Sequence, residues 1–351
     1  MAPQFWMVTD RNIQGNQLGG NHNETEDPLT FWTSTEVDAK KLTSNLRSWT
    51  RRTKEQFKAL LVGATKDFPA IKDLSEQEKQ KHVTFFVHGY NTSWNDAARR
   101  YHSVSQNLFS GSDSLGLCVL FTWPSDGMAL GYLPDRLDAR LAAPDLAAVL
   151  NQLYDWMLVQ QQVVGDPKKA CRAKTSLIAH SMGAFVLQKA MQLVWTRQNQ
   201  PLLISLINQL LLVAADIDND IFKGGEAVTK TDGDAIANLC YRVSALYTGR
   251  DSTLGLSAGL KHFGKRRLGR SGLDDPEDVP DNVWQVDCST LISPNAKNVH
   301  SSYFDEPRTI DLMREVLRGI DRNVLVARGL VPLPAPPVAA IPALGPTVAP
   351  A

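Results

Sequence analysis

Short, continuous apolar stretches alternate along the chain with longer segments in which apolar residues recur at helical spacing. The continuous stretches predict buried strands at residues 82–87, 115–123, 177–179, 208–215, 239–247 and 283–286. Helical spacing predicts helices at residues 95–108, 138–164 (with a break at Pro144), 185–191 and 302–320. Apolar strands separated by helices are typical of a mostly parallel sheet covered on both faces. The pattern therefore predicts an α/β fold that binds ligands beyond the carboxyl ends of its strands.

The two ends of the chain do not follow this alternation. Residues 36–68 are rich in Lys, Arg and Thr interspersed with large apolar residues, which predicts an amphipathic helical segment on the outside of the sheet. A helix that binds a partner is the alternative. From residue 329 onward Pro, Ala and Val dominate, which predicts a disordered or polyproline-like tail. We therefore expect one α/β domain over residues 1–328 and a tail over 329–351.

Composition narrows the functional classes. Lys plus Arg and Asp plus Glu both number 37 among 351 residues, so no net charge favours nucleic acid or an anionic membrane. The N-terminus lacks a basic segment followed by an apolar one, and no run of about twenty apolar residues could span a membrane, so we expect a cytoplasmic protein. The four cysteines lie far apart without C-x-x-C spacing, which predicts free, buried thiols and no metal site: Cys118, Cys171, Cys240 and Cys288. The oligomeric state is left open.

The segment SLIAHSMGAFVLQKAM, residues 176–191, carries the most specific chemistry. A short apolar run ends in His180-Ser181-Met182-Gly183, and a helix-forming run follows at once. In a sharp strand–turn–helix unit the central residue has a strained backbone and its side chain projects beyond the sheet edge. Ser181 is therefore the predicted nucleophile, and an incidental serine in an ordinary turn is the alternative reading.

A nucleophilic serine needs hydrogen-bond donors for the oxyanion. One is the N–H of the next residue, Met182, and another comes from the loop after an earlier strand. The segment FVHGYN supplies such a loop, so we assign the second donor to the Tyr90 N–H, with Asn91 as an additional side-chain donor. His88 could contact the substrate, but a histidine that fixes the loop by bonding backbone is the favoured interpretation.

The general base is sought among seven histidines. His300 lies in the NVHSSY loop between the last predicted strand and the last helix, where this architecture places its histidine. His180 adjoins the serine, but its side chain should point away from that of Ser181, into the sheet. His262 lies among five Lys and Arg residues and is more typical of a solvated surface. His300 is therefore the predicted base.

The carboxylate that orients the histidine has more than one candidate. Asp251 follows the strand at 239–247, whereas Asp216 and Asp218 follow the strand at 208–215. All of them satisfy the chain order Ser, Asp, His. We prefer Asp251, because the acid normally follows the penultimate strand, and keep Asp216 and Asp218 as alternatives. Trp123 and Tyr132 are candidate substrate-binding residues, although each is also an ordinary core aromatic.

Seven segments together carry a resemblance to a known family. They are VTDRN (8–12), FFVHGYNTSW (85–94), FTWPSDG with GYLPDR (121–127, 131–136), AHSMGAFVL (179–187), AADIDNDIF (214–222), YTGRDSTLGLS (247–257) and the NVHSSY loop. In this order they resemble a bacterial family of α/β-hydrolases of unknown function. The resemblance implies the α/β-hydrolase fold and a triad of Ser181, Asp251 and His300. The stretch between Asp216 and Leu239, where many α/β-hydrolases carry a lid, is short, which predicts little or no cap domain. Residues 36–68 and the tail are not part of that pattern.

The predicted activity is hydrolysis of carboxylic esters through an acyl-enzyme, with a small-molecule ester of short acyl chain as substrate and no cofactor. An alkoxide leaves more easily than an amine, and the sequence lacks phosphate-loop, dinucleotide-binding and H-E-x-x-H motifs. An acyltransferase or thioesterase on the same triad is one alternative. The other is a catalytically inactive interaction protein that binds through the N-terminal helical segment or the tail.

Overall fold

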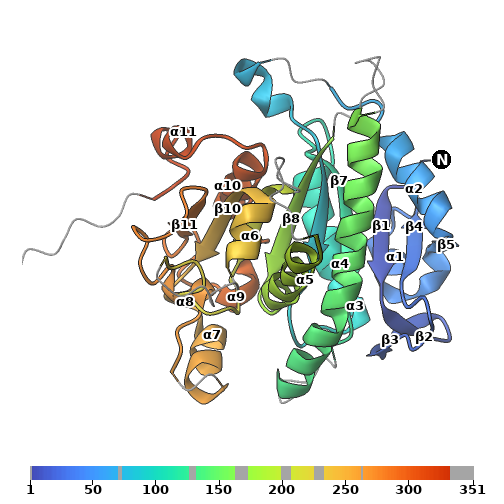
Figure 1. The fold of residues 1–351 in the computed structure, drawn as a ribbon, viewed down its shortest axis with the longest axis horizontal. Helices are drawn as coiled ribbons and strands as arrows, with labels where there is room; N and C mark the ends of the chain where they lie inside the picture. The colour runs from blue at the N-terminus through green and yellow to red at the C-terminus, as the bar shows by residue number, and fades with distance from the viewer. Residues whose placement is uncertain are drawn as a thin grey trace, which may run out of the picture.

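A nine-stranded sheet forms the centre of the computed structural model (Figure 1), which describes residues 2–69, 73–125, 132–162, 173–198, 207–224, 233–261 and 264–332. The strand order across the sheet is β11-β10-β9-β8-β6-β7-β1-β4-β5. A separate hairpin pairs β2 with β3. The bounds are β1 Phe5–Thr9, β2 Arg11–Gln14, β3 Gln17–His22, β4 Thr30–Ser34, β5 Thr50–Arg52, β6 His82–Val87, β7 Gly116–Thr122, β8 Lys174–His180, β9 Ile207–Val213, β10 Cys240–Tyr247 and β11 Val283–Asp287.

Seven neighbouring strands, from β11 to β1, run parallel, and β4 and β5 add an antiparallel edge. The predicted α/β class is therefore confirmed. The loops after β6, β7, β8, β9 and β10 consequently meet at one edge of the sheet, the edge of the carboxyl ends. The helix α7 (Ser252–Leu256) lies at this end, at the bottom of Figure 1.

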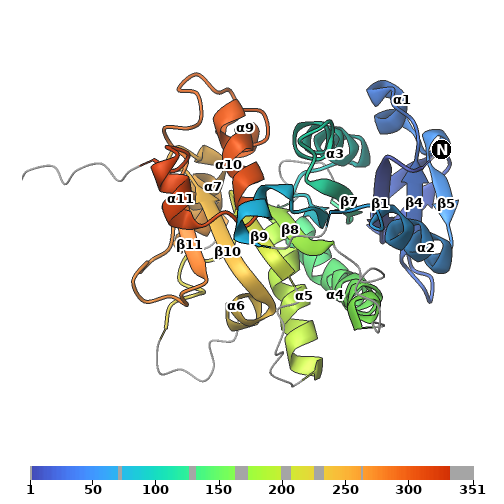
Figure 2. The ribbon, with the colours of Figure 1, turned by 90° about the horizontal axis from the view of Figure 1, so that it is seen from above.

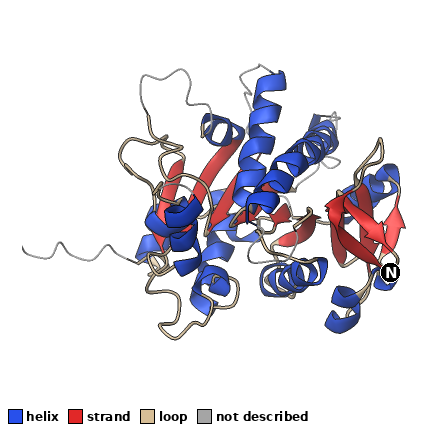
Figure 3. Ribbon diagram, turned by 90° about the horizontal axis from the view of Figure 1, so that it is seen from below, coloured by secondary structure: helices blue, strands red, loops and turns tan. Residues whose placement is uncertain are grey.

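Helices cover both faces of the sheet, as the views along the strands show (Figure 2, Figure 3). Alternate strand residues feed two separate cores, so that Phe85 packs into one and Phe86 into the other. The first core is covered by α2 (Lys54–Ala64), α4 (Tyr132–Gln162), α5 (Gly183–Gln198) and α6 (Asp234–Leu239). The second core is covered by α1 (Ala39–Ser44), α3 (Trp94–Phe109), α10 (Pro307–Leu317) and α11 (Arg322–Ala327).

Residues 36–68 differ from the single helical segment that the sequence predicts. They form α1, a short 3₁₀ turn at Leu46–Ser48, the strand β5 and then α2. The strand forms because Thr50, Arg51 and Arg52 pair with the free edge of β4. Propensity alone does not reveal this pairing, because the partner strand lies about twenty residues earlier.

Two helix predictions are also corrected. α4 continues through Pro144 without ending, because Pro144 lies on its exposed side while Ala143, Leu146 and Ala147 bury the opposite side in the core. The helix predicted at 302–320 is interrupted: α9 (Val299–Ser302) ends at residue 302, and α10 begins only at Pro307 and ends at Leu317. Pro307 begins α10, since a proline fits the first helical turn and not a helix interior.

The described residues also show the state of three cysteines, the apolar length of the helices and the grouping of possible metal ligands. Cys118, Cys240 and Cys288 are buried free thiols, while Cys171 and the tail from residue 333 lie outside the described part. Within that part, no helix is long and apolar enough to cross a bilayer. The same residues contain no cluster of three or more His, Cys, Asp or Glu suited to a metal ion.

Candidate active site

Ser181 occupies the sharp turn between β8 and α5. Its φ is 54°, in the left-handed region that serine rarely adopts, as the strand–turn–helix pattern predicts. The Ser181 N–H donates to the Val213 carbonyl (3.0 Å), and the Ser181 carbonyl accepts from the Asp216 N–H (3.0 Å). Both bonds tie the turn to the end of β9. A Cβ at Gly183 would lie 2.6 Å from the Val87 carbonyl oxygen, so only glycine allows α5 to start this close to β6.

The loop after β6 passes directly over Ser181. A Cβ on Gly89 would lie 2.7 Å from the Ser181 Cβ and 3.2 Å from its Oγ, so a side chain at this position would crowd the hydroxyl. The backbone of Gly89 and Tyr90 therefore lies beside the serine. On the other side, the Met182 N–H has no hydrogen-bond partner among the described residues and lies at the start of α5, where N–H groups favour negative charge.

His300 and Asp251 are in direct contact. The His300 Nδ1 lies 2.6 Å from the Asp251 Oδ2, and because a carboxylate accepts, Nδ1 carries the proton. The other Asp251 oxygen, Oδ1, accepts from the Leu254 N–H (2.9 Å) and caps α7. Asp251 is fully buried and its carboxylate is fixed at both oxygens. This contact holds the imidazole in one tautomer and leaves Nε2 for another partner.

Asp216 and Asp218 have a different partner. The Arg267 Nε donates to the Asp216 Oδ1 (2.7 Å), which also accepts from the Ser257 hydroxyl (3.0 Å). Arg267 is fully buried and its Nη1 also donates to Asp218. Of the three candidate carboxylates, the structure therefore brings Asp251 to His300 and brings Asp216 and Asp218 to Arg267.

His180, the residue before Ser181, also contacts His300. Its Nε2 donates to the His300 carbonyl oxygen (3.0 Å), and the two rings lie 4.9 Å apart between centroids. Burial, with His300 nearby, holds the pKa of His180 well below its usual value, so the ring is neutral. The side chain thus turns toward the His300 loop and Phe304, whereas the sequence suggested only that it points into the sheet. Sequence reasoning missed this positioning contact, although the position next to Ser181 was visible.

His88 fixes the loop that carries Gly89 and Tyr90. Its Nδ1 donates to the Gly89 carbonyl (2.8 Å), and its Nε2 accepts from the Thr122 hydroxyl (3.0 Å) and the Trp123 N–H (3.3 Å). Burial, with a smaller effect of Arg11, lowers the pKa of His88 to about 3. The indole of Trp123 stacks on the imidazole at 5.3 Å and donates to the His88 carbonyl. Trp123 is fully buried, so it supports the loop of Gly89 and Tyr90 from the core and does not line a cavity.

Asp135 and Ser125 hold the next residues of the same loop. The Asp135 Oδ2 accepts from the Asn91 N–H (3.0 Å) and from the Ser125 hydroxyl (2.6 Å), and the Ser125 Oγ accepts from the Thr92 N–H (3.1 Å). Asn91 itself has a φ of 55°, so these bonds stabilise a strained backbone. Ser125 lies in the motif WPS and Asp135 in the motif PDR. Both motifs contributed to the family resemblance, but sequence reasoning assigned neither residue a role in the site.

Arg11, of the VTDRN motif, is the third support. Its guanidinium donates to the Thr92 carbonyl (2.9 Å), to the Thr122 hydroxyl (3.0 Å) and to the Gly19 carbonyl (3.0 Å). The side chain is 1% exposed. Arg11 therefore joins the β2–β3 hairpin to the loop over Ser181 and, through Thr122, to His88.

A cavity of about 540 Å³ opens beside these residues. Gly89, Tyr90, Asn91, His180 and His300 form part of its wall. The side chain of Tyr132, at the start of α4, lies outside the described part of the chain, as does His262. Two other aromatic residues of the resemblance segments, Trp94 and Phe222, are buried in the core.

A family model described as an alpha/beta hydrolase of unknown function (DUF900) matches residues 66–308, more than half of the chain. The chain belongs to this family. The matched range of the α/β-hydrolase includes Ser181, Asp251 and His300, while Arg11 and the strands β1–β5 precede it. Among the residues that the structure describes, no separate cap domain covers the sheet of this α/β-hydrolase.

Individual relatives of the α/β-hydrolase are distant. An uncharacterized protein of Nostoc sp. is 21% identical over 303 residues, which cover 69% of this chain and 75% of that protein. A solved structure described as a cell surface hydrolase of Lactobacillus plantarum is similar with a TM-score of 0.35 and 7% identity, over 71% of this chain and 96% of that one. An esterase structure of Pyrobaculum calidifontis has a TM-score of 0.34 and 11% identity, over 69% and 77%.

Proposed function

We propose that this α/β-hydrolase cleaves carboxylic esters, with Ser181 as nucleophile, His300 as general base and acid, and Asp251 as the carboxylate that orients the histidine. The observation that carries the proposal is the 2.6 Å contact between His300 and Asp251 at the sheet edge where Ser181 occupies a strained turn. Membership of the family supports hydrolase activity in general. The alternative acids Asp216 and Asp218 are disfavoured, because they bind the buried Arg267.

The reaction follows from these positions. The Ser181 Oγ attacks the ester carbonyl carbon while the His300 Nε2 accepts the hydroxyl proton, and the Met182 and Tyr90 N–H groups bind the oxyanion. Collapse of the tetrahedral intermediate breaks the bond to the alcohol oxygen, which takes the proton from His300. Water, deprotonated by His300, then attacks the acyl-enzyme and releases the acid. Asp251 stabilises the imidazolium in both halves without accepting its proton.

The substrate class is narrowed by leaving-group chemistry and by the lack of a cap domain in the described part of the chain. An alkoxide leaves more easily than an amine, which favours esters over amides. With no cap domain in the described part of the chain, an open site would give a long acyl chain little apolar cover, so we expect short acyl groups. Activity that rises steadily with acyl length up to long lipids would contradict this part of the proposal.

The direct test is hydrolysis of p-nitrophenyl acetate and butyrate by the wild type, Ser181→Ala and His300→Ala. We expect both variants to lose about 10³-fold or more of kcat. Ser110→Ala, a serine at the exposed end of α3, is the matched control and should retain wild-type rates. A fluorophosphonate probe should label Ser181 in the wild type. An inert wild type that the probe fails to label would remove the hydrolase proposal and favour an interaction protein.

A further inference from the structure

The cavity beside His300 has polar walls. Its volume of about 540 Å³ falls within the ~300–1,000 Å³ usual for small-molecule sites. Such sites are mostly lined by apolar side chains. Here the described lining contains hydroxyl, amide, imidazole, carboxylate and guanidinium groups. Tyr90 is the one Phe, Tyr or Trp among the described lining residues, and none of them has an aliphatic side chain. An alkyl group in this cavity would remove water from these polar groups without replacing its hydrogen bonds, whereas a hydroxyl group would replace them.

One wall is a polar stripe along α3. Asp96, Arg99, Arg100 and Ser103 follow helical spacing, so they lie on one face of the helix, and all four line the cavity. The opposite face of α3 is buried in the core, through residues that include Tyr101, Val104 and Leu108. Because α3 directly follows the loop at Tyr90, this stripe begins next to the candidate oxyanion donors.

The facing wall comes from the region around His300. Asn298, Ser301 and Asp305 lie there, together with Thr253 of α7. Arg100 binds Asp305 through two contacts from its Nη1, at 3.0 and 3.1 Å, and so connects the two walls. Arg99 pairs with Asp96 on the stripe itself.

The charges of these walls are balanced. Each arginine has a carboxylate partner, so an anionic ligand would have to compete with Asp305 for Arg100. A hydroxyl group suits such paired walls better, because it donates to a carboxylate and accepts from a guanidinium at the same time. The walls therefore favour a neutral ligand that carries several hydroxyl groups.

The position of the cavity decides which part of an ester it holds. In the proposed reaction His300 gives its proton to the leaving alcohol oxygen, so the alcohol part must lie beside His300. We propose that the natural substrate is an ester of a neutral, hydroxyl-rich alcohol, a sugar or another polyol, whose hydroxyls bind the α3 stripe and the residues 298–305. This inference rests on the proposed esterase function and adds its alcohol specificity.

The test compares alcohols that carry one and the same acetyl group. We expect kcat/KM for methyl 6-O-acetylglucopyranoside and glycerol monoacetate to exceed that for hexyl acetate by about tenfold or more, which is the net effect of about one or two hydrogen bonds. Equal or faster hydrolysis of hexyl acetate would overturn the proposal. So would a preference for an anionic alcohol such as O-acetylmalate, because the walls would then be recognising charge.

Variants locate the preference in the cavity. The double variant Arg100→Met/Asp305→Leu removes both members of the ion pair, so neither charge is left unpaired. It should lower the ratio of kcat/KM for the sugar ester to kcat/KM for the hexyl ester about tenfold. If that variant does not fold, Arg99→Met and Ser103→Leu on the stripe test the same ratio. Arg328→Leu is the control: it removes another arginine that pairs with carboxylates, far along the chain, and should keep the wild-type ratio. An unchanged ratio in every stripe variant would overturn the proposal.

The experiments distinguish a wrong alcohol specificity from a wrong esterase proposal. Fluorophosphonate labelling of Ser181 and turnover of p-nitrophenyl acetate report on the triad without any sugar. If both succeed and the sugar ester shows no advantage, only the alcohol specificity is wrong. If both fail, the esterase proposal falls and the specificity falls with it.

Discussion

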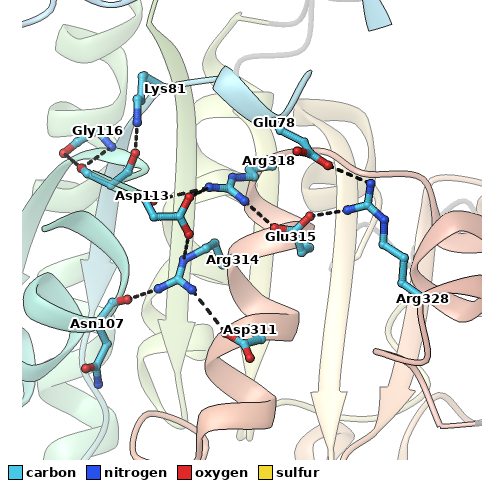
Figure 4. Close-up of polar contacts among 11 residues, drawn as sticks. Glu78, Lys81, Asn107, Asp113, Gly116, Asp311, Arg314, Glu315, Arg318 and Arg328 are labelled. Carbon is cyan, nitrogen blue, oxygen red and sulfur yellow. Dashed lines mark hydrogen bonds and ion pairs between the residues drawn. The ribbon is translucent and has the colours of Figure 1, made fainter. Parts of the chain in front are cut away.

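Arg11, at one end of the sheet, has partners of a different kind from three arginines at the other end. At the carboxyl ends of the strands, Arg11 is buried and donates to the carbonyls of Thr92 and Gly19 and to a hydroxyl. At the amino ends, Arg314, Arg318 and Arg328 bind carboxylates that lie largely at the surface and connect α10 to the loop before β7 and to the 3₁₀ turn at Leu74–Lys79 (Figure 4). The first arrangement fixes a loop by its backbone, and the second fastens surface elements by their side chains.

The burial of the charged groups decides how much each arrangement contributes to the free energy of unfolding. A buried polar group that loses its partner keeps the full cost of desolvation, about 1–3 kcal/mol for a neutral group and more for a charge. An exposed ion pair competes with water and salt and contributes about 0–1 kcal/mol. Substitution of a buried group such as Arg11 should therefore change rate, stability or both, and substitution of an exposed one such as Arg328 should change little.

The largest effects are expected at two buried carboxylates at the carboxyl end, one on kcat and the other on stability. Asp251→Asn should lower kcat on p-nitrophenyl acetate about 10³–10⁴-fold, because an amide does not hold the same His300 tautomer. The asparagine Oδ1 can still accept from the Leu254 N–H, so the fold should persist. Asp216→Asn should instead lower the free energy of unfolding by about 3–5 kcal/mol, because it weakens the partner of the buried Arg267.

Steady-state kinetics and urea unfolding of both variants measure these effects. The kcat of folded Asp216→Asn should stay within about tenfold of the wild type, since that carboxylate does not contact His300. A larger loss of kcat in Asp216→Asn than in Asp251→Asn would transfer the orienting role to Asp216.

The second effect concerns the loop over Ser181. Arg11→Lys keeps the charge but replaces a planar fork of donors by a single ammonium, so the Thr92, Thr122 and Gly19 contacts cannot all be made. We expect kcat to fall about 10²-fold with KM nearly unchanged, because a displaced Tyr90 N–H weakens binding of the oxyanion more than of the ester.

A control separates positioning from general destabilisation. Assays well below the unfolding temperature exclude loss of folded enzyme, and Arg318→Lys at the amino end should leave kcat unaltered. An equal fall of kcat in the two lysine variants, or a rise in KM without loss of kcat in Arg11→Lys, would contradict a role of Arg11 in holding the oxyanion loop.

A third effect compares histidines at the two ends of β6. Burial lowers the pKa of His82, at its start, and of His88, after its end, to about 3 each. Between pH ~6.5 and 3 the unfolded chain binds protons that the folded protein does not. The contribution of each such histidine to the free energy of unfolding is therefore fully present above pH ~6.5. Below that pH it falls by about 1.4 kcal/mol per pH unit.

His82→Gln tests this dependence away from the candidate site. Glutamine can still bond the Ser176 hydroxyl, which the His82 Nδ1 contacts at 2.6 Å, but it does not titrate. Urea unfolding at pH 5.5, 5.0 and 4.5 should show a free energy of unfolding whose slope against pH is shallower by about 1.4 kcal/mol per unit than in the wild type. An identical slope would mean that His82 is not kept neutral by the fold.

The central strands and the turn at Ser181 were predictable because their signals are local. Buried parallel strands must be apolar throughout, and a serine between a strand and a helix with glycine two positions later restricts the backbone strongly. The proximity of Asp251 and His300 was predictable too, because residues that follow parallel strands meet at one edge. Their catalytic roles stay predictions.

The supports of the site could not be predicted, because they depend on contacts between distant residues. Arg11 and Thr122 are 111 residues apart in sequence, and Asn91 and Asp135 are 44 apart. An arginine in a short polar motif is equally compatible with a solvated surface, and only the folded sheet shows that Arg11 is enclosed. The strand β5 was missed for the same reason, since its Thr and Arg residues become a strand only through pairing with β4.

The smallest effect is expected at the amino end. Arg328 binds Glu78 at 2.8 Å and Glu315 at 2.9 Å, and its side chain is 41% exposed. Arg328→Met should lower the free energy of unfolding by at most about 1 kcal/mol and leave kcat unchanged, and the difference should shrink between 0.05 and 0.5 M NaCl because salt screens exposed charges. Urea unfolding at both salt concentrations measures it. A loss above about 2 kcal/mol that salt does not reduce would show that this network behaves like the buried contacts of Arg11, and the contrast between the two ends would then lie in their partners and not in their exposure.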